Sequence, residues 1–327
     1  MRRIGLAHVT AAAFVAAAGC LSGCSPAAPP TATSSPGAAT VFAIDADFPD
    51  PDVLRVGKNY YAYATNSPAS NVQLATSSDA RTWTVTTVDP LPKLPSWASP
   101  GKTWAPDVSQ VKPDVFVMYV VVANTKPALQ CIAVATSSSP RGPFTPAGTG
   151  PLICPDGEGG AIDPATFVDT DGTRYLLWKN DGNCCGLDTW LQIAPLSRDG
   201  LTLTGAPTKL IKQTAAWEGS VVEAPTLVRR GSSYVLLYSA NSYADGSYAT
   251  GYATATSVLG PYRKHPVPLL STESSKGRFV GPGGQDVVTT ADGHDLLVFH
   301  SWDPAFVYRR LDVLPLSWKN GEPVVTP

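Results

Sequence analysis

The sequence carries little charge of either sign. Lysine and arginine number 24 and aspartate and glutamate 26, so the 327 residues have a formal net charge of −2, and no run of basic residues occurs. Proteins that bind nucleic acid neutralise phosphates with clustered basic side chains, so this composition argues against a nucleic-acid partner. A chain with so few charges fits an uncharged substrate.

Long apolar runs and helical periodicity are also missing from most of the chain. Beyond the amino-terminal segment, no apolar stretch approaches the roughly 18 residues that cross a bilayer, so we expect no membrane-spanning segment there. In their place stand 31 prolines, 28 glycines and many valine, threonine and tyrosine residues. This mixture is typical of strands joined by tight turns.

The amino terminus has the pattern of a bacterial export signal. Two arginines precede a mostly apolar stretch, residues 4–18, and Leu21-Ser22-Gly23-Cys24 closes the segment. The closing sequence matches the lipobox, in which the peptide is cut before the cysteine and the thiol receives a lipid. We therefore expect residues 1–23 to be a signal peptide and Cys24 to be lipidated. Cys20 fits the pattern less well, and an ordinary signal peptide that leaves Cys24 as a free thiol is the alternative.

Two segments are expected after this cut. Residues 24–40 are almost entirely Ser, Pro, Ala, Thr and Gly, which cannot bury apolar surface, so we expect an extended tether. Residues 41–327 exceed the usual ~100–200 residues of a domain, yet no second low-complexity linker divides them. We expect one large closed β domain, exported and held at the outer face of the cell membrane only through its lipid.

Four cysteines remain in that domain. An exported protein meets an oxidising compartment, so we expect disulfides, and four thiols allow three pairings. We expect Cys131 to pair with Cys154, which leaves Cys184 and Cys185 as a pair of chain neighbours. Adjacent cysteines without a nearby histidine do not have the spacing of a zinc site.

A short apolar strand with an aromatic residue recurs five times, at intervals of 56, 59, 60 and 61 residues. An apolar residue and a polar or glycine-rich turn precede each aromatic, which indicates a hairpin, and a third and a fourth strand follow in most units. Five units of four strands predict an all-β, five-bladed β-propeller, with a β-sandwich of coincidental spacing as the alternative. The five aromatic residues are Tyr63, Tyr119, Trp178, Tyr238 and Phe299.

The candidate chemistry lies just before the first strand of each unit, because in a propeller these segments point toward the axis. Asp50, Asp163 and Glu223 each precede a proline directly or by one residue, in the first, third and fourth units. Proline biases the residue before it to extended geometry, so we expect rigidly held carboxylates. Three carboxylates in one cleft raise the pKa of at least one of them, which acid catalysis near neutral pH requires.

Five motifs in a fixed order resemble glycoside hydrolase family 43, and the resemblance extends from Phe48 to about Pro323. It implies that Asp50 is the general base that activates water, Glu223 the general acid and Asp163 the residue that orients Glu223 and tunes its pKa. These roles suit an inverting mechanism, in which base and acid stand about 6.5–9.5 Å apart. The motifs are Asp50-Pro51-Asp52-Val53 with Tyr60-Tyr61, Trp104-Ala105-Pro106-Asp107-Val108, Ile162-Asp163-Pro164 with Asp169-Thr170-Asp171-Gly172, Val222-Glu223-Ala224-Pro225, and Gly281-Pro282-Gly283 with Phe299-His300.

Five further side chains are candidates for substrate binding. Trp104, and Phe48 and Trp217 beside the base and the acid, have aromatic faces that suit the C–H faces of sugars, with a place in the core as the alternative. Arg310 stands where the family often has an arginine that reaches the sugar, with a solvated salt bridge as the alternative. Gln285 follows Gly-Pro-Gly-Gly, a variant that looks closest to arabinan-directed members.

No cofactor is expected to be required. Many members of the family place a histidine after Gly-Pro-Gly, associated with a central metal or water cluster, whereas Gly284 and Gln285 follow here. An axial calcium ion is therefore left open. We interpret Asp107 as a residue that holds loops in place, and His300 as a buried, hydrogen-bonded side chain near the axis.

The resemblance implies an exo-acting α-L-arabinofuranosidase, or an exo-arabinanase on α-1,5-linked chains. β-Xylosidase is the nearest alternative, because family members share the fold and the catalytic acids while loops select the sugar; D-arabinofuranose from wall polymers is another. A non-catalytic carbohydrate-binding propeller would have lost a catalytic acid, and all three are present. A five-bladed fructan hydrolase would carry different motifs, which we do not find.

Overall fold

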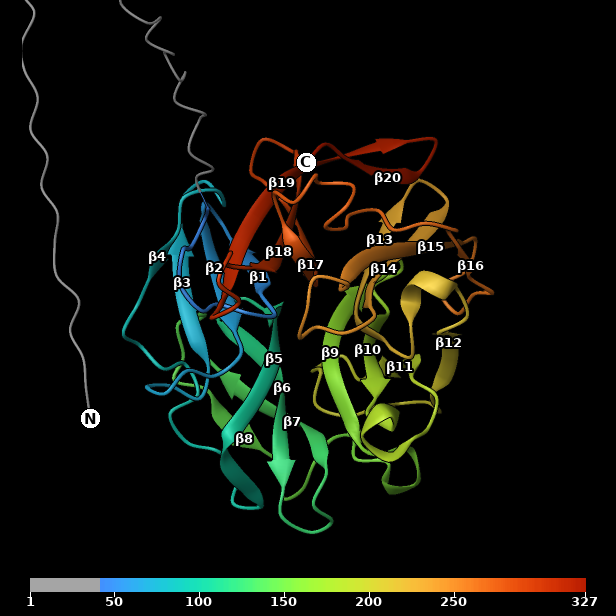
Figure 1. Ribbon diagram of the computed structural model, residues 1–327. Helices are drawn as coiled ribbons and strands as arrows, with labels where there is room; N and C mark the ends of the chain where they lie inside the picture. The colour runs from blue at the N-terminus through green and yellow to red at the C-terminus, as the bar shows by residue number, and fades with distance from the viewer. Residues whose placement is uncertain (1–41) are drawn as a thin grey trace, which may run out of the picture. The chain divides into compact units, whose positions relative to one another are not determined.

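The computed structural model describes residues 42–327. The expected signal peptide (1–23), the tether (24–40) and the lipidated Cys24 lie outside the described residues. Five four-stranded antiparallel sheets stand in a ring (Figure 1), so the chain forms an all-β, five-bladed propeller, as its repeat predicts. No helix within residues 42–327 is long and apolar enough to span a membrane.

Each blade is one continuous stretch of chain, and its first strand faces the axis, where it contacts the first strands of both neighbouring blades. The blades are β1 (Asp52–Val56), β2 (Asn59–Ala64), β3 (Gln73–Ser77), β4 (Thr84–Val85); β5 (Ala98–Lys112), β6 (Val115–Asn124), β7 (Gln130–Ser137), β8 (Thr145–Ala147); β9 (Ala161–Val168), β10 (Arg174–Asn180), β11 (Trp190–Leu196), β12 (Thr208–Lys212); β13 (Val222–Arg230), β14 (Ser233–Ala240), β15 (Ala249–Ala255), β16 (Arg263–Lys264); and β17 (Val280–Thr289), β18 (Asp295–Trp302), β19 (Arg309–Lys319), β20 (Glu322–Val325). Three short 3-10 helices lie in the connections: η1 (Asp156–Glu158), η2 (Gly182–Cys185) and η3 (Ala216–Glu218).

The aromatic residue that defines the repeat lies in the second strand of every blade, packed between two sheets. Its ring is fully buried, and where it carries a hydroxyl group that group finds a partner. Tyr63 donates to Pro140 O and Tyr119 to Gly200 O, both at 2.6 Å, and each acceptor lies in the blade that follows. All five residues therefore fill the core between blades, and Tyr63 and Tyr119 also link neighbouring blades by hydrogen bonds.

The ring closes through the segment that precedes β1. The N–H groups of Ala43 and Ile44 donate to Leu311 O at 3.1 and 3.2 Å, and Leu311 donates to Ile44 O at 3.1 Å. Phe48 N–H donates to Arg309 O at 2.9 Å. Leu311 and Arg309 belong to β19 of the last blade, so these bonds join the two ends of the ring and cover part of an open strand edge.

The inner part of each blade contains one residue with a left-handed backbone, and the strand register shifts around it in β5, β9, β13 and β17. Such β-bulges redirect side chains and are common beside active sites. The expectation of extended geometry before proline is wrong for Asp50 and Asp163, which have left-handed φ values, and at Asp163 the β-bulge of β9 overrides the local preference. The five residues are Asp50 (φ 55°), Ala105 (39°), Asp163 (54°), Ala224 (50°) and Gly284 (56°).

Three inner-strand aspartates each join one blade to the next. In every case one carboxylate oxygen accepts a backbone N–H of the neighbouring inner strand at 2.9 Å. Burial raises the pKa of Asp107 to about 7 and that of Asp286 to about 6, because the charged form has lost its water. Asp107 thus holds two blades together, in line with its interpretation as a structural residue. The pairs are Asp286 with Val53, Asp52 with Val108, and Asp107 with Thr166.

We expect Asp107→Asn to stabilise the protein at pH 8 by a few kcal/mol, at about 1.4 kcal/mol per unit of pKa shift, because burial disfavours the ionised carboxylate and the amide carries no charge. The amide oxygen still accepts the N–H of Thr166. The native carboxyl has a pKa of about 7 against an ordinary 3.8, so its contribution to stability is present below pH 4 and is lost as the pH rises to 7.

Thermal unfolding at pH 5 and pH 8 checks this, with Asp114→Asn in the exposed β5–β6 turn as the control. The gain should be larger at pH 8 than at pH 5 for Asp107→Asn and absent for Asp114→Asn. An equal loss of stability at pH 5 and pH 8 would show that the charge of Asp107 does not destabilise the fold.

One disulfide joins two cysteines that we expected to pair. Cys131 and Cys154, with Cα atoms 4.7 Å apart, connect β7 to the segment that leads into η1. Cys184 and Cys185 are chain neighbours on η2, and their pairing stays a prediction. That helix borders the central cavity described below.

Candidate active site

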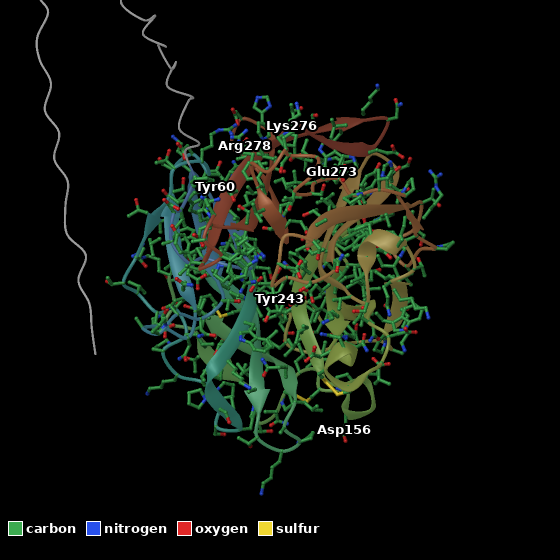
Figure 2. The ribbon with its side chains drawn as sticks, in the orientation of Figure 1. Tyr60, Asp156, Tyr243, Glu273, Lys276 and Arg278 are labelled. Atoms are coloured by element: carbon green, nitrogen blue, oxygen red, sulfur yellow. A yellow bond between two sulfur atoms is a disulfide. The ribbon has the colours of Figure 1, made fainter. Side chains whose placement is uncertain are left out.

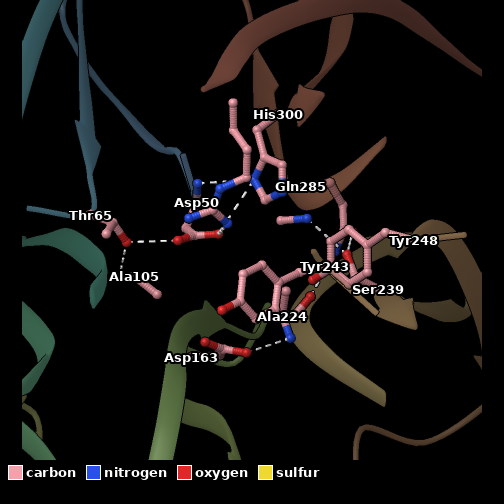
Figure 3. A network of polar contacts seen from close by, with 12 residues as sticks. Asp50, Thr65, Ala105, Asp163, Ala224, Ser239, Tyr243, Tyr248, Gln285 and His300 are labelled. Carbon is pink, nitrogen blue, oxygen red and sulfur yellow. Dashed lines mark hydrogen bonds and ion pairs between the residues drawn. The ribbon is translucent and has the colours of Figure 1, made fainter. Parts of the chain in front are cut away.

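A cavity of about 710 Å³ opens at the axis and is lined by residues from all five blades. It brings together the three acids found in the sequence: Asp50 from the segment before β1, Asp163 from β9 and Glu223 from β13. Trp104 and Gln285, two of the predicted substrate-binding residues, line the same cavity. Figure 3 shows the polar contacts that hold Asp50 and Asp163 in place.

The surroundings of Asp50 favour the ionised carboxylate. The Thr65 hydroxyl donates to Oδ2 at 2.7 Å and accepts the N–H of Ala105 at 3.0 Å, while Arg309 Nη1 donates to Oδ1 at 3.2 Å. Burial by itself would raise the pKa of Asp50, but the Arg309 guanidinium and the hydrogen bonds outweigh it and lower this pKa below 3.8. Asp50 is therefore charged at neutral pH, as a general base must be.

His300 supports the backbone of Asp50 without adding a charge. Its Nδ1 accepts the N–H of Asp50 at 3.1 Å, and its ring stacks on Tyr248 with centroids 5.8 Å apart. Burial and the nearby Arg309 lower the pKa of His300 to about 3, so the ring is neutral at pH 7. The 3.4 Å approach of Nδ1 to Asp50 Oδ1 is then not an ion pair. His300 is buried and hydrogen-bonded, as interpreted from the sequence.

Asp163 and Glu223 form the second acidic group of the cavity. Asp163 Oδ2 accepts the N–H of Ala224 at 2.9 Å, and Glu223 Oε1 accepts the hydroxyl of Tyr248 at 2.8 Å. Burial raises the pKa of Asp163 to about 7, and the negative charge of Glu223 acts in the same direction. Asp163 thus retains its proton near neutral pH, whereas Asp50 is ionised.

A buried lysine that the sequence analysis missed contacts Glu223. Lys179, on β10, has no exposed side-chain surface, and its Nζ lies 3.3 Å from Glu223 Oε2. The same Nζ donates to Asn183 Oδ1 at 2.6 Å and lies 3.5 Å from Asp181 Oδ1. The sequence does contain a signal for it, because Lys179 directly follows the apolar run Tyr175-Leu176-Leu177-Trp178. A lysine buried at the end of such a strand needs a partner for its charge.

Phe48 and Trp217 do not reach the cavity, which corrects two of the predicted substrate contacts. Phe48 is fully buried in the core of blade 1. Trp217, on η3, stacks on Tyr238 with ring centroids 5.8 Å apart and packs into the core shared by blades 3 and 4. The core alternative was the right one for both, because aromatic side chains bury more area between blades than at the rim of a cavity.

The predicted arginine, Arg310, also points away from the cavity. Neighbouring residues on a strand face opposite sides, and it is Arg309 that lines the cavity and contacts Asp50. Arg310 is 4% exposed, lies over the ring of Phe42 at 3.4 Å and donates to Trp302 O at 3.0 Å. The sequence motif Arg309-Arg310 alone did not tell which of the two faces inward.

Trp104 and Gln285 are placed where they can meet a ligand. Trp104 is half-buried and separates the main cavity from a smaller one of about 490 Å³ between blades 2 and 3. Gln285 is held on both sides, since its Nε2 donates to Ala224 O and its Oε1 accepts the Ser239 hydroxyl, each at 2.7 Å. Gln285 thereby fixes the backbone beside Glu223.

A calcium ion on the axis would need six to eight oxygen ligands. Gly284, which follows Gly-Pro-Gly, has no side chain, and a Cβ there would lie 2.5 Å from the His300 ring. Within residues 42–327, no three His, Cys, Asp or Glu side chains are grouped so as to hold a metal ion. His300 occupies the space beside Gly284 in which a side chain at that position would lie.

Comparison with known proteins identifies the family of the chain. The family model of Glycosyl hydrolases family 43 matches residues 43–323. The extracellular endo-α-(1→5)-L-arabinanase 1 of Bacillus subtilis (strain 168) is 28% identical, over 84% of this chain and 86% of its own. The extracellular exo-α-(1→5)-L-arabinofuranosidase of Cellvibrio japonicus (strain Ueda107) is also 28% identical, over 84% and 85%.

A solved structure gives the same result for the fold. The endo-1,4-β-xylanase from Bacteroides thetaiotaomicron VPI-5482 superposes with a TM-score of 0.74 at 28% identity, covering 88% of this chain and 96% of its own. The match of the family model extends across all five blades and includes all three acids of the cavity. The chain therefore belongs to glycosyl hydrolases family 43 and is a glycosidase.

Proposed function

We propose that this glycosidase releases arabinofuranose from arabinan or from arabinose-containing polysaccharide with inversion of configuration. Asp50 is the general base that activates water, Glu223 the general acid at the leaving oxygen, and Asp163 the residue that tunes Glu223. Trp104 and Gln285 contact the sugar.

The observation that carries this proposal is the opposite electrostatic environment of the two acidic groups. Arg309 keeps Asp50 ionised, whereas burial beside Glu223 keeps a proton on Asp163 up to about pH 7. Ionised Asp50 can accept a proton from water, and the Asp163–Glu223 pair retains a proton near neutral pH that Glu223 can pass to the leaving oxygen. Asp50 and Glu223 also come from non-adjacent blades, which suits the wider spacing that an attacking water needs.

Arabinan is favoured as the substrate by the two arabinan-directed relatives, each of which spans most of this chain. A xylan-derived substrate is the second candidate, because the xylanase structure has the same identity of 28%. Loops around a shared set of acids select the sugar in such families.

Hydrolysis of aryl α-L-arabinofuranoside, aryl β-xyloside and linear arabinan by the purified domain tests the proposal, with the product anomer followed by NMR. We expect the arabinofuranoside to be the best aryl substrate and the β-anomer to appear first. A first-formed α-anomer would refute inversion. Faster hydrolysis of the xyloside would show that xylose, not arabinose, is the sugar that the enzyme releases.

We also propose that turnover requires no metal ion. Within residues 42–327, no three His, Cys, Asp or Glu side chains are grouped so as to hold a metal ion, and the roles above use side chains alone. The rate of hydrolysis should be the same with EDTA as with added calcium. A loss of activity in EDTA that calcium restores would contradict this.

Export and lipid anchoring are part of the same proposal. The two arabinan-directed relatives are extracellular proteins, and the lipobox ends at Cys24. In a bacterial host, Cys24→Ser should move most of the protein from the membrane fraction to the soluble fraction, while Cys20→Ser should leave it in the membrane. Membrane retention of Cys24→Ser would show that Cys24 is not the lipidation site.

A further inference from the structure

Exposed apolar side chains of blades 4 and 5 gather at one edge of the central cavity. Tyr243 is 54%, Phe306 48% and Val307 74% exposed, and Tyr243 also lines the cavity. Figure 2 labels Tyr243 near the middle of the ring. We call Tyr243, Trp302, Phe306 and Val307 the aromatic ridge. Contiguous exposed apolar groups beside a cavity mark a binding surface rather than chance exposure.

The aromatic ridge is continuous from the catalytic acids outward. Arg309 contacts Asp50 at 3.2 Å, and its guanidinium lies 5.3 Å from the ring centroid of Tyr243. Trp302 Nε1 donates to Tyr243 O at 2.8 Å, and the rings of Trp302 and Phe306 are 5.8 Å apart. Each ridge residue is therefore linked to the next. Arg309 contacts both Tyr243, the innermost ridge residue, and Asp50, the proposed base.

The outer end of the ridge is held by a well-bonded turn. The Asp303 carboxylate is 6% exposed and accepts the N–H groups of Ala305, Val307 and Tyr308 at 2.8, 2.6 and 2.9 Å. Phe306 has a left-handed backbone with φ 55°, which a bulky residue adopts only where its surroundings hold it. The turn thus presents Phe306 and Val307 to solvent in a fixed position, which reduces the entropy lost on binding.

We infer that the aromatic ridge binds the part of the glycan chain that extends out of the catalytic cavity, a deepening that rests on the proposed function. The ligand is a neutral oligosaccharide, because the ridge side chains carry no charge and Arg309 is already paired with Asp50. Aromatic faces match the C–H faces of sugar rings, and continuity with the cavity lets one chain occupy both. The cavity alone receives the terminal sugar.

Chain-length dependence tests this inference. For wild type, Phe306→Ala and Val168→Ala, kcat/KM is measured on aryl α-L-arabinofuranoside and on α-1,5-arabinohexaose, with the aryl xyloside and β-1,4-xylohexaose in parallel. Val168 is the matched control, since it is also 48% exposed but lies at the far end of β9, three residues or about 10 Å beyond Ala165, the last residue of β9 that lines the cavity. Phe306→Ala should lower the ratio of hexaose to aryl kcat/KM about three- to tenfold, the effect of one aromatic contact.

Calorimetric binding of the same hexaoses to Glu223→Gln and to Glu223→Gln with Phe306→Ala needs no turnover. The second variant should bind three- to tenfold more weakly. Equal binding, or an unchanged ratio in the rate experiment, would overturn the inference. Absence of any hydrolysis by the wild type would refute the proposed function instead, while the binding experiment would still decide whether the ridge holds the chain.

Discussion

Replacement of either proposed catalytic acid should remove almost all turnover and leave the fold intact. We expect Glu223→Gln and Asp50→Asn each to lower kcat on an arabinoside with a poor leaving group by about 10²–10⁴-fold, the usual contribution of a general acid or base. The amides preserve shape, and in Glu223→Gln the amide oxygen would still accept the hydroxyl of Tyr248, so binding of sugar should persist.

The two variants should differ in one respect that reveals their roles. A good leaving group such as dinitrophenolate needs no proton, so Glu223→Gln should recover much of its activity on a dinitrophenyl glycoside, whereas Asp50→Asn should not. Glu158→Gln, on η1 outside the cavity, is the control and should behave as wild type. Unchanged turnover in both variants would show that Asp50 and Glu223 are not the catalytic acids, and the reverse pattern of recovery would exchange their roles.

Loss of the buried lysine should affect both the rate and its pH dependence. Lys179 Nζ lies 3.3 Å from Glu223 Oε2, so Lys179→Met removes a contact that orients the proposed acid. We expect kcat to fall about 10- to 100-fold, the size of effect that a misplaced catalytic group produces.

The pH profile distinguishes this from a general structural defect. The charge of Lys179 acts to lower the pKa of Asp163 from the higher value that burial alone would give, and this pKa is about 7 with the lysine present. Without the lysine, Asp163 keeps its proton to higher pH, so the basic limb of kcat/KM should move to higher pH. Lys209→Met, whose lysine is 46% exposed and pairs with Glu158, should change neither quantity. If kcat falls but the basic limb of the pH profile does not move, Lys179 contributes only to packing.

The architecture could be predicted from the sequence because its signal is repeated. A single apolar strand could belong to many folds, but five buried aromatics such as Tyr63 and Trp178 at intervals of about sixty residues describe one repeating unit. The three acids could be found for a related reason, since equivalent segments of a propeller converge on one axis. Asp50, Asp163 and Glu223 all line the cavity.

The direction in which single side chains point could not be predicted in the same way. Asp50 and Asp163 adopt left-handed φ values against the preference of residues before proline, and at Asp163 this occurs in a β-bulge of the inner strand β9. Arg309 and Arg310 face opposite sides of β19, and the sequence does not tell which of them faces the cavity. Phe48 and Trp217 were misplaced because an aromatic residue near an acid suits both a core and a sugar site.

The sequence by itself determined the number of blades and the position of the acids in the chain, since both depend on spacing along the chain. The tertiary structure selected Cys131 with Cys154 among the three pairings that four cysteines allow, because pairing depends on which thiols the fold brings together. Only the tertiary structure decided which carboxyl is ionised. Arg309 and Lys179 come from strands far from Asp50 and Glu223 in sequence, and the pKa of a buried acid depends on such neighbours and on lost water, which chain order does not encode.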